Sequence, residues 1–494
     1  MDTIGAYLLK DEYGDYVIPA VHQRPVLLLG APGIGKTQIM EQIAAECGIG
    51  LVSYTITHHT RQSAIGLPVI SKETFGGREY TMTGYTMSEI IASVYQKMEK
   101  TGLSEGILFI DEVNCVSETL APAMLQFLQC KTFGTHEVPP GWIIVTAGNP
   151  PEYNRSVRDF DVVTMDRVKK IEVEPDLEVW KKYAWEVRVH PAVISYLNIR
   201  PRNFYRMETT VDGRFFATPR GWEDLSRLLQ VYEKLSKKTD MEVVLQYIQH
   251  PEIARDFADY LELYDSYQAD GLLDAVFEGR IEDLLLKRLA HATFDERLSV
   301  LGLLLARCGN AFSEYVRYED YLSLLHGTLK GIKAQLLDGS GGPQDLTESV
   351  LSSMKAETEA KERAELLSRE EKKIRRMAEA FWEKAVRDTK TGGSRDGEAV
   401  FAALKESFSV EKDRYDQAYR TAAQTLQYAF DLLEAAFGTG QEIVLFLTEL
   451  NADNRSLRFL SRYDCERYYR YNQTLLYEDR NRQLLKKIEA VTGD

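Results

Sequence analysis

Eight residues near the amino terminus have the types and the spacing that bind phosphate. The stretch Gly30-Ala-Pro-Gly-Ile-Gly35-Lys36-Thr37 matches the pattern G-x-x-x-x-G-K-[ST]. Glycines let backbone N–H groups curl around phosphate oxygens, and the start of the following helix adds a partial positive charge. We expect Lys36 to reach the β- and γ-phosphates and Thr37 to offer its hydroxyl to Mg²⁺. The alternative is a plain glycine turn between a strand and a helix. The predicted ATP-binding residues of this loop are Gly30, Ala31, Pro32, Gly33, Ile34, Gly35, Lys36 and Thr37.

An apolar run that begins at Gly106 ends in two adjacent acids, Asp111 and Glu112. Buried strands rarely end in two carboxylates without cause, because an unpaired buried charge is costly. We expect Asp111 to hold Mg²⁺ of the bound ATP through the water shell of the ion. We expect Glu112 to accept a proton from the attacking water as a general base. The alternative is a strand end whose acids are simply solvated.

The next apolar run, Ile143–Ala147, is followed by Gly148, Asn149 and Pro150. If this strand lies beside the strand that ends in the two acids, the Asn149 amide could orient the attacking water and sense the γ-phosphate. An asparagine before proline is also common in turns. We favour the sensor role because of the position at a strand end.

Arg220 lies in the first turn of a predicted helix, since Thr218 suits the N-cap and Pro219 the first helical position. A helix dipole disfavours a cation there, and a bound phosphate would remove that conflict. We therefore predict that Arg220 touches the γ-phosphate from a lid. The alternative is an ion pair with Glu223 or Asp224.

Arg167 follows Asp166, just before the last predicted strand of the sheet. We expect it on the outer edge of the nucleotide domain, away from its own phosphate site. From there it could reach the ATP of a neighbouring subunit as an arginine finger, which requires a ring with head-to-tail interfaces. Arg155 and Arg158 compete for this role, and the alternative is an ordinary surface arginine.

A sheet must position these residues, and apolar stretches separated by helical ones imply parallel strands with ligands at their carboxyl ends. The predicted strands are Val26–Leu29, Leu51–Thr57, Ile107–Asp111, Ile143–Ala147 and Val168–Val173. The predicted fold class is an α/β P-loop NTPase core, with a parallel five-stranded sheet between helices. A small helical lid and a mostly α-helical C-terminal half follow this core.

From about Asp176 onward the strand signal fades and helical spacing dominates. The stretch Asp338–Pro343 is the clearest linker. Met354–Val386, rich in Glu, Lys, Arg and Ala, predicts one long exposed helix. A plain solvated helix is the favoured interpretation, and a spacer or a partner-binding arm is the alternative. The predicted domains are 1–175 (nucleotide-binding core), 176–240 (helical lid), 241–337 (helical region), 338–397 (linker and charged helix) and 398–494 (last helical region).

Composition narrows the class of protein. The 494 residues carry a formal net charge of −15, which disfavours a general nucleic-acid coating role because such proteins present a basic face. No apolar run approaches the ~20 residues that cross a bilayer, and no signal peptide is visible. The five cysteines are scattered without a CxxC pair. This disfavours a disulfide framework or a zinc site and favours the reducing cytoplasm.

In this order and spacing, the motifs resemble the AAA+ ATPases and, within them, the MoxR group. The resemblance covers about residues 20–235. The motifs that carry it are Gly30–Thr37, Asp111-Glu112-Val113-Asn114, Ala147–Pro150, Asp166-Arg167 and Thr218-Pro219-Arg220. The family usually has an arginine where this chain has Cys115, and a phenylalanine where it has Val168.

The resemblance implies a hexameric ring that hydrolyses ATP at its subunit interfaces. It also implies chaperone-like remodelling or activation of client proteins, often with a partner that carries a von Willebrand factor A domain. MoxR-like proteins carry a hairpin in the second helix of the core, and here Leu67–Ile70 and Glu79–Met82 flank Gly76-Gly77. The residues before this hairpin that could line a pore are His58, His59, Arg61 and Gln62. The two histidines have no third metal ligand in range.

Two other functions come from different classes. One is a nucleic-acid-linked AAA+ motor, and the other is a nucleotide-gated scaffold with little turnover. Overall acidity argues against the first, and the intact Asp111–Glu112 pair argues against the second. Residues 455–471 interleave arginines with aromatic side chains, which can stack single-stranded nucleic acid. A solvated arginine face is the simpler interpretation of that segment.

Overall fold

The computed structural model describes residues 1–58, 64–133, 136–153, 162–211, 213–269, 271–337, 342–392 and 396–473. By internal contacts the chain divides into two compact units. Unit 1 consists of Met1–Pro175 with Ser353–Lys372, and unit 2 consists of Asp176–Ser352 with Lys373–Asp494.

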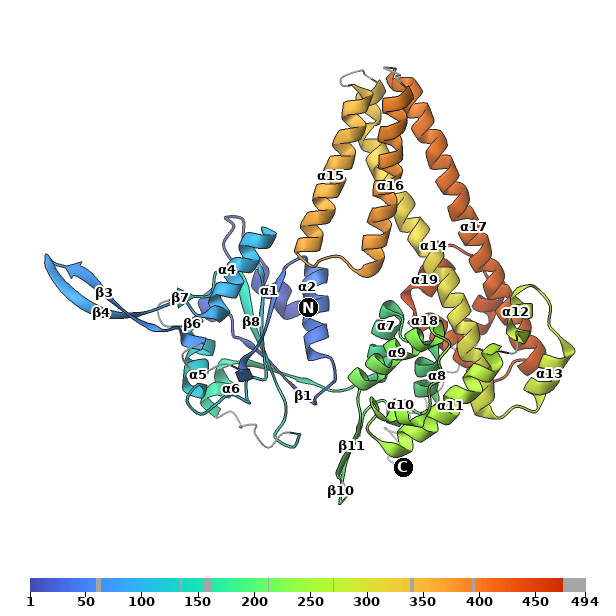
Figure 1. The fold of residues 1–494 in the computed structure, drawn as a ribbon, viewed down its shortest axis with the longest axis horizontal. Helices are drawn as coiled ribbons and strands as arrows, with labels where there is room; N and C mark the ends of the chain where they lie inside the picture. The colour runs from blue at the N-terminus through green and yellow to red at the C-terminus, as the bar shows by residue number, and fades with distance from the viewer. Residues whose placement is uncertain are drawn as a thin grey trace, which may run out of the picture. The chain divides into compact units, whose positions relative to one another are not determined.

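Unit 1 contains a five-stranded parallel sheet in the order β2-β5-β8-β1-β9 (Figure 1). The strands are β1 Val26–Gly30, β2 Gly50–Thr55, β5 Gly106–Asp111, β8 Trp142–Gly148 and β9 Lys169–Val173. The chain passes from β1 to the far edge at β2, returns strand by strand to β8, and then crosses β1 to reach β9. The predicted α/β fold class is confirmed, and β1 marks the point where the crossover direction reverses.

Helices cover both faces of this sheet. They are α1 Asp2–Leu8, α2 Lys36–Cys47, α4 Glu89–Thr101, α5 Ala121–Cys130 and α6 Val162–Arg167. Side chains alternate along the strands, so Leu27 and Leu108 join a core with α4 and α5. Val26 and Ile107 join a separate core with α1 and α2 on the opposite face. The continuous apolar runs of the sequence therefore reflect strands that are buried on both sides.

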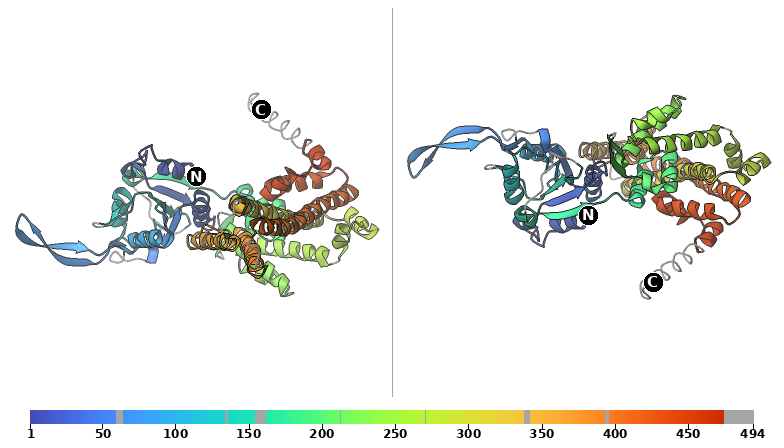
Figure 2. Two further views of the ribbon diagram at one scale, coloured as in Figure 1. Left: turned by 90° about the horizontal axis from the view of Figure 1, so that it is seen from above. Right: turned by 90° about the horizontal axis from the view of Figure 1, so that it is seen from below.

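A hairpin of β3 Pro68–Phe75 and β4 Arg78–Tyr85 extends away from the sheet of unit 1 (Figure 2). Gly76 and Gly77 form its turn with φ angles of 57° and 80°, which the type I′ turn requires. The predicted hairpin is thus present. A shorter pair, β6 Thr132–Phe133 and β7 His136–Glu137, lies elsewhere in unit 1.

Gly106 is required by a close approach within the sheet. A Cβ there would lie 2.6 Å from the Trp142 ring and 2.7 Å from the Gly50 carbonyl oxygen. We expect Gly106→Ala to lower the free energy of unfolding by about 1–3 kcal/mol, because Trp142 is fully buried and cannot retreat without moving its neighbours. Thermal or urea unfolding measures this change. Gly5→Ala in α1 is the control, since no atom lies within 4 Å of a Cβ there; equal stability of the two variants would contradict the prediction.

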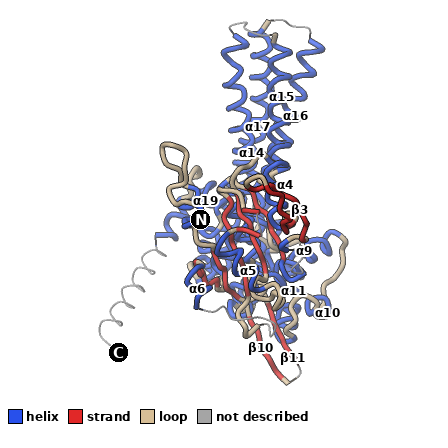
Figure 3. Tube along the Cα trace, turned by 90° about the vertical axis from the view of Figure 1, so that its left-hand side faces the viewer, coloured by secondary structure: helices blue, strands red, loops and turns tan. Residues whose placement is uncertain are grey.

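Unit 2 is mostly helical, as the tube colouring of Figure 3 shows. Its helices, described by position in the chain, are α7 Leu177–Val187, α8 Pro191–Ile199, α9 Pro219–Lys234, α10 Met241–Leu245, α11 Pro251–Ala269, α12 Leu272–Phe277, α13 Asp283–Ala290, α14 Phe294–Leu337, α17 Gly397–Phe437, α18 Gln441–Ala452 and α19 Asn454–Leu460. Over the described residues, none of the helices combines the length and the hydropathy that a bilayer crossing needs.

Two sequence expectations for this half of the chain are wrong in detail. The strand signal does not end at Asp176, because β10 Arg206–Thr210 and β11 Gly213–Ala217 form an antiparallel pair ahead of α9. The charged stretch is not one helix either. It is divided between α15 Pro343–Arg363 and α16 Arg369–Gly392.

The break between α15 and α16 has a local cause. The Ser368 backbone N–H donates to Glu371 Oε2 at 2.7 Å, and the Glu371 N–H donates to Ser368 Oγ at 3.2 Å. This reciprocal capping box starts a new helix, and its S-x-x-E pattern was visible in the sequence. The stretch is not wholly exposed, because Trp382 is fully buried and its Nε1–H donates to Thr328 of α14.

One hydrophobic core runs through unit 2. Its members include Trp180 of α7, Leu225 of α9, Phe312 of α14, Phe430 of α17 and Phe446 of α18. The long helices α14 and α17 run side by side over this core (Figures 1 and 3). The helices expected to form a lid therefore share their interior with the helices that follow them.

A buried ion pair reinforces that shared interior. Lys181 of α7 and Glu449 of α18 are 2.6 Å apart, and their side chains are 3% and 5% exposed. The Lys181 ammonium also donates to Asn198 Oδ1 of α8 at 2.9 Å. The consecutive helices α7 and α8 and the distant helix α18 thus meet at one charge.

Lys181→Met is expected to lower the free energy of unfolding by about 3–5 kcal/mol, because it leaves the Glu449 carboxylate buried without its cation. The double variant Lys181→Met/Glu449→Leu should recover most of this loss, since two apolar side chains can replace a buried pair. Urea unfolding followed by tryptophan fluorescence gives both values. A double variant that is as unstable as the sum of its single variants would show that the two residues are not coupled.

Candidate active site

The predicted phosphate loop connects β1 to α2, as its sequence requires. Gly33 and Gly35 have φ angles of 77° and 92°, a region that side chains with a Cβ avoid. Gly35 is also the N-cap of α2, and its carbonyl accepts from the Ile39 N–H at 3.0 Å. The loop therefore directs the amino end of α2 toward the carboxyl edge of the sheet, where an anion is favoured.

Lys36 is buried at 8% exposure, and its ammonium lies within the loop that it follows. It donates to the Gly30 carbonyl at 2.9 Å, the Ala31 carbonyl at 3.0 Å and Asn149 Oδ1 at 2.9 Å. The last contact brings together two residues that the sequence singled out for different reasons. Asn149 follows β8, the neighbour of β1, so its amide reaches the lysine at the carboxyl edge of the sheet.

The acid pair ends β5, and its two members have different surroundings. Asp111 Oδ1 accepts from the Glu112 N–H at 2.8 Å, and Glu112 has a φ of 58°, unusual for a residue with a side chain. Glu112 Oε2 accepts a hydrogen bond from the Thr57 hydroxyl at 2.9 Å. The turn at Glu112 therefore points its carboxylate toward the segment that follows β2.

Thr57 was not recognised in the sequence as a site residue. It lies in a short 3-10 helix, Ile56–His58, directly after β2. Thr55 of β2 is in register with Asp111 of β5, so a residue shortly after each strand reaches the same edge. A hydroxyl on the last residue of the expected strand Leu51–Thr57 is the available signal, but the pairing of β2 with β5 has to be known to use it.

A cavity of about 550 Å³ opens beside the loop. Its lining includes Gly30, Asn114 and Asn149, together with residues 150–153 and 172–175. It thus lies at the carboxyl end of β1, between the ends of β8 and β9, where the crossover direction reverses. Ligands of open parallel sheets bind at this position, and the volume falls in the range of small-molecule sites.

Thr37 and Asp111 offer the oxygen donors that Mg²⁺ prefers. Thr37 lies in the first turn of α2 and Asp111 at the end of β5, so both lie at the carboxyl edge of the sheet, and both are partly buried. Mg²⁺ uses one or two such groups and completes its shell with phosphate oxygens and water. The described part of the chain holds no cluster of three or more His, Cys, Asp or Glu side chains suited to a metal ion. The donor set therefore fits a nucleotide-bound Mg²⁺ rather than a metal held by the protein alone.

The predicted arginines lie apart from this edge or in the other unit. Arg167 is exposed and ends α6, just before β9, whose first residue Lys169 pairs with Val26 at the start of β1. It therefore lies at the amino end of the sheet's edge strand, opposite the phosphate loop. Arg155 and Arg158 lie outside the described residues, as do His59, Arg61 and Gln62 of the expected pore segment.

Arg220 belongs to unit 2 and is exposed in the first turn of α9. Thr218 caps this helix by accepting from the Gly221 N–H at 3.2 Å. The carboxylates of Glu223 and Asp224 bind Arg227. Glu223 and Asp224, the partners that the sequence suggests for Arg220, thus pair with Arg227 instead.

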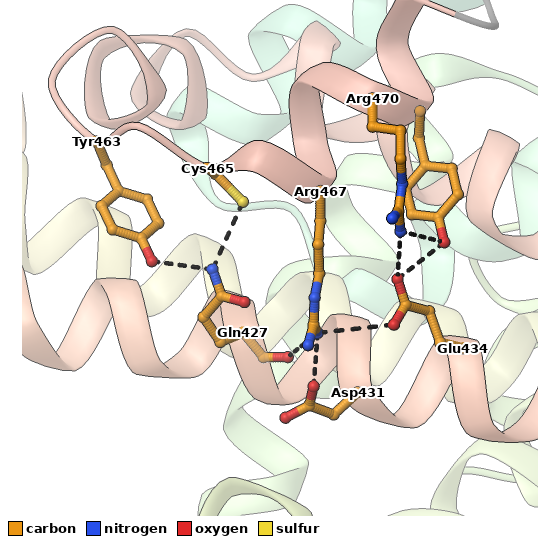
Figure 4. Close-up of polar contacts among 8 residues, drawn as sticks. Gln427, Asp431, Glu434, Tyr463, Cys465, Arg467 and Arg470 are labelled. Carbon is orange, nitrogen blue, oxygen red and sulfur yellow. Dashed lines mark hydrogen bonds and ion pairs between the residues drawn. The ribbon is translucent and has the colours of Figure 1, made fainter.

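The arginines between 455 and 470 are engaged inside unit 2. Arg467 donates to Asp431 at 2.5 Å and Arg470 donates to Glu434 at 3.1 Å. Figure 4 shows both pairs. Arg458 binds Asp320 and Glu319, and these bonds raise the pKa of its guanidinium above the usual value. These contacts favour a structural role for the segment over nucleic-acid binding.

Residues 26–162 match the family model of the ATPase family associated with various cellular activities (AAA). The matched range contains the phosphate loop, the acid pair and Asn149, which are the residues that meet at the carboxyl edge of the sheet. No curated protein gives a significant match to the chain. The chain therefore carries an ATPase domain of the AAA family, and it is an ATP hydrolase.

Proposed function

We propose that this ATPase belongs to the MoxR type and works as a ring to remodel or activate client proteins. The observation that carries the proposal is the joint position of Lys36, Asn149 and Glu112. Lys36 bonds Asn149, which follows the neighbouring strand β8, and Glu112 at the end of β5 accepts from Thr57, which lies just after the adjacent strand β2. These contacts link the groups expected to bind, sense and hydrolyse the terminal phosphate.

Each residue has a defined part in this proposal. Lys36 and the loop N–H groups neutralise the triphosphate, while Thr37 and Asp111 would hold Mg²⁺, which supplies further charge neutralisation to the phosphates. Asn149 orients the attacking water. Glu112 accepts its proton, and the Thr57 hydroxyl holds the Glu112 carboxylate in place.

The ring is supported by the position of Arg167. An exposed arginine at the sheet edge opposite the phosphate loop is badly placed for its own ATP but well placed for that of a neighbour. The hexamer and a client or von Willebrand factor A partner are carried only by the resemblance to MoxR proteins, whereas the lid role of Arg220 also rests on its place in the first turn of α9. The exposed hairpin β3–β4 is compatible with that resemblance, because Ile70 and Tyr80 are 75% and 49% exposed on it.

Complementation between two inactive variants tests the ring. Arg167→Ala and Lys36→Ala should each lose most ATPase activity when assayed alone. In mixed rings some interfaces join an intact Arg167 to an intact Lys36. Mixing should therefore raise the ATPase activity above the sum of the activities of the two variants assayed alone. Lys169→Ala, which removes an exposed cation two residues away, should remain active. A mixture that never exceeds the sum would remove Arg167 from the neighbour's site.

The nucleic-acid alternative is tested in the same assay. ATPase activity is measured with single-stranded DNA, duplex DNA and RNA. We expect no stimulation, since the arginine-rich segment is ion-paired internally and the chain is acidic overall. Strong stimulation by any of them would favour a nucleic-acid-linked motor.

A further inference from the structure

Asn114 connects the two strand ends that carry the expected base and the expected sensor. After the turn at Glu112, the Val113 N–H donates to the Ala147 carbonyl at 2.9 Å, which continues the pairing of β5 with β8. Asn114 then lies against the end of β8, and its Nδ2 donates to the backbone carbonyl of Asn149 at 2.8 Å. It is 4% exposed. A single side chain thus links the loop of Glu112 to the backbone of Asn149.

The fit around Asn114 is close. A Cβ on Gly148 would lie 2.7 Å from Asn114 Oδ1, so β8 ends in the one residue type that leaves room for this side chain. Asn114 also lines the cavity beside the phosphate loop. Small displacements of Asn114 would therefore move the Asn149 backbone directly.

The polar side chain of Asn114 destabilises the fold, and its packing gives no reason for a polar residue at this position. Its Oδ1 is buried and has no hydrogen-bond partner among the described residues. Leaving a buried acceptor unpaired costs about 1–3 kcal/mol, and a leucine of similar size would avoid this. What a leucine could not supply is the N–H donor to Asn149.

We propose that Asn114 is a positioning residue that sets Asn149 relative to Glu112, so that ATP hydrolysis depends on it while ATP binding does not. This inference rests on the roles proposed above for Asn149 and Glu112. Asn114 donates to the carbonyl of Asn149 and leaves the Asn149 side chain free to keep its bond to Lys36. Its effect on catalysis therefore passes through the position of Asn149.

Asn114→Leu tests the proposal. It removes the donor and the unpaired acceptor with little change in size. We expect kcat to fall by about 10–100-fold, because a misplacement of about 1 Å at a catalytic group has an effect of this order. The Kd for ATP, measured by titration with ATP and Mg²⁺, should stay within about threefold. A fall of kcat and ATP affinity together would overturn the proposal.

Thr146→Val is the matched control for a loss of kcat that comes only from a destabilised β8. Thr146 is also buried on β8, and its hydroxyl donates to the Val26 carbonyl at 3.2 Å. The variant removes a side-chain to backbone hydrogen bond from the same strand without touching Asn149. We expect its kcat to stay close to wild type, and an equal loss of kcat in Thr146→Val and Asn114→Leu would overturn the proposal.

Asn149→Ala distinguishes a failure of the proposed sensor role of Asn149 from a failure of the proposal for Asn114. If Asn149→Ala keeps full kcat, the proposed sensor role fails, and the proposal for Asn114 fails with it. If Asn149→Ala loses kcat while Asn114→Leu does not, only the proposal for Asn114 fails. The expected result is that both single variants lose kcat and that Asn114→Leu causes no further loss in an Asn149→Ala background, because Asn114 acts through Asn149.

Discussion

Replacing Lys36 by alanine is expected to weaken ATP binding at least ~100-fold and to reduce hydrolysis to background, because a charged hydrogen-bond donor contributes about 1.5–3 kcal/mol to each phosphate it binds. The ammonium is buried beside the loop carbonyls, and no other lysine lies in the loop to replace it. Isothermal titration with ATP and Mg²⁺ and a phosphate-release assay measure the two effects.

Lys131→Met is the control for this prediction. Lys131 is also largely buried and donates to a backbone carbonyl, that of Ala20, at 2.5 Å. It lies after α5, away from the phosphate loop, so its loss should leave ATP affinity near wild type. Unchanged ATP affinity in Lys36→Ala would mean that the triphosphate is bound elsewhere.

Glu112→Gln is expected to keep ATP binding while slowing turnover by about 10²–10⁴-fold, the usual contribution of a general base. Glutamine keeps the size of the side chain, and its amide oxygen can still accept from the Thr57 hydroxyl. The variant therefore removes the basic oxygen with little change in geometry. Single-turnover hydrolysis and ATP titration separate the chemical step from binding.

Glu105→Gln gives the matched comparison, since Glu105 lies just before the other end of β5. It pairs with Lys10 at 2.7 Å and accepts from the Tyr16 hydroxyl at 2.9 Å. We expect normal turnover when this carboxylate is lost. Normal turnover in Glu112→Gln as well would remove Glu112 from the mechanism.

Much of the α/β core could be predicted from sequence because local signals and tertiary structure agree there. β1, β5 and β8 are buried on both faces, so each appears as an unbroken apolar run such as Ile107–Ile110. The phosphate loop has little freedom, since Gly33 and Gly35 need positive φ angles. The association of Lys36 with Asn149 then follows from the order of parallel strands.

The features that the sequence does not predict are of two kinds. Some depend on contacts between residues distant in the chain, and others depend on a short local motif within a longer stretch of helical composition. The contact of Thr57 with Glu112 and the contact of Asn114 with Asn149 depend on the pairing of β2 with β5 and of β5 with β8, although Asn114 already belongs to a motif that carries the family resemblance. Charged neighbours dominate the sequence around Trp382 and so predict an exposed helix, although Trp382 is fully buried beside Thr328. The Ser368 capping box was overlooked because helical composition continues on both sides of it.

The common interior of unit 2 has a mechanical consequence. Trp180, Phe312 and Phe430 share one core and Lys181 binds Glu449, so α7 and the first part of α14 are packed into a single interior. α14 has 44 residues, so at about 1.5 Å per residue it spans about 66 Å. A tilt of about 5° at its base would swing the far end through about 6 Å by this geometry. The length of α14 would thus turn a small rotation of the core of unit 2 into a larger displacement at the far end of that helix.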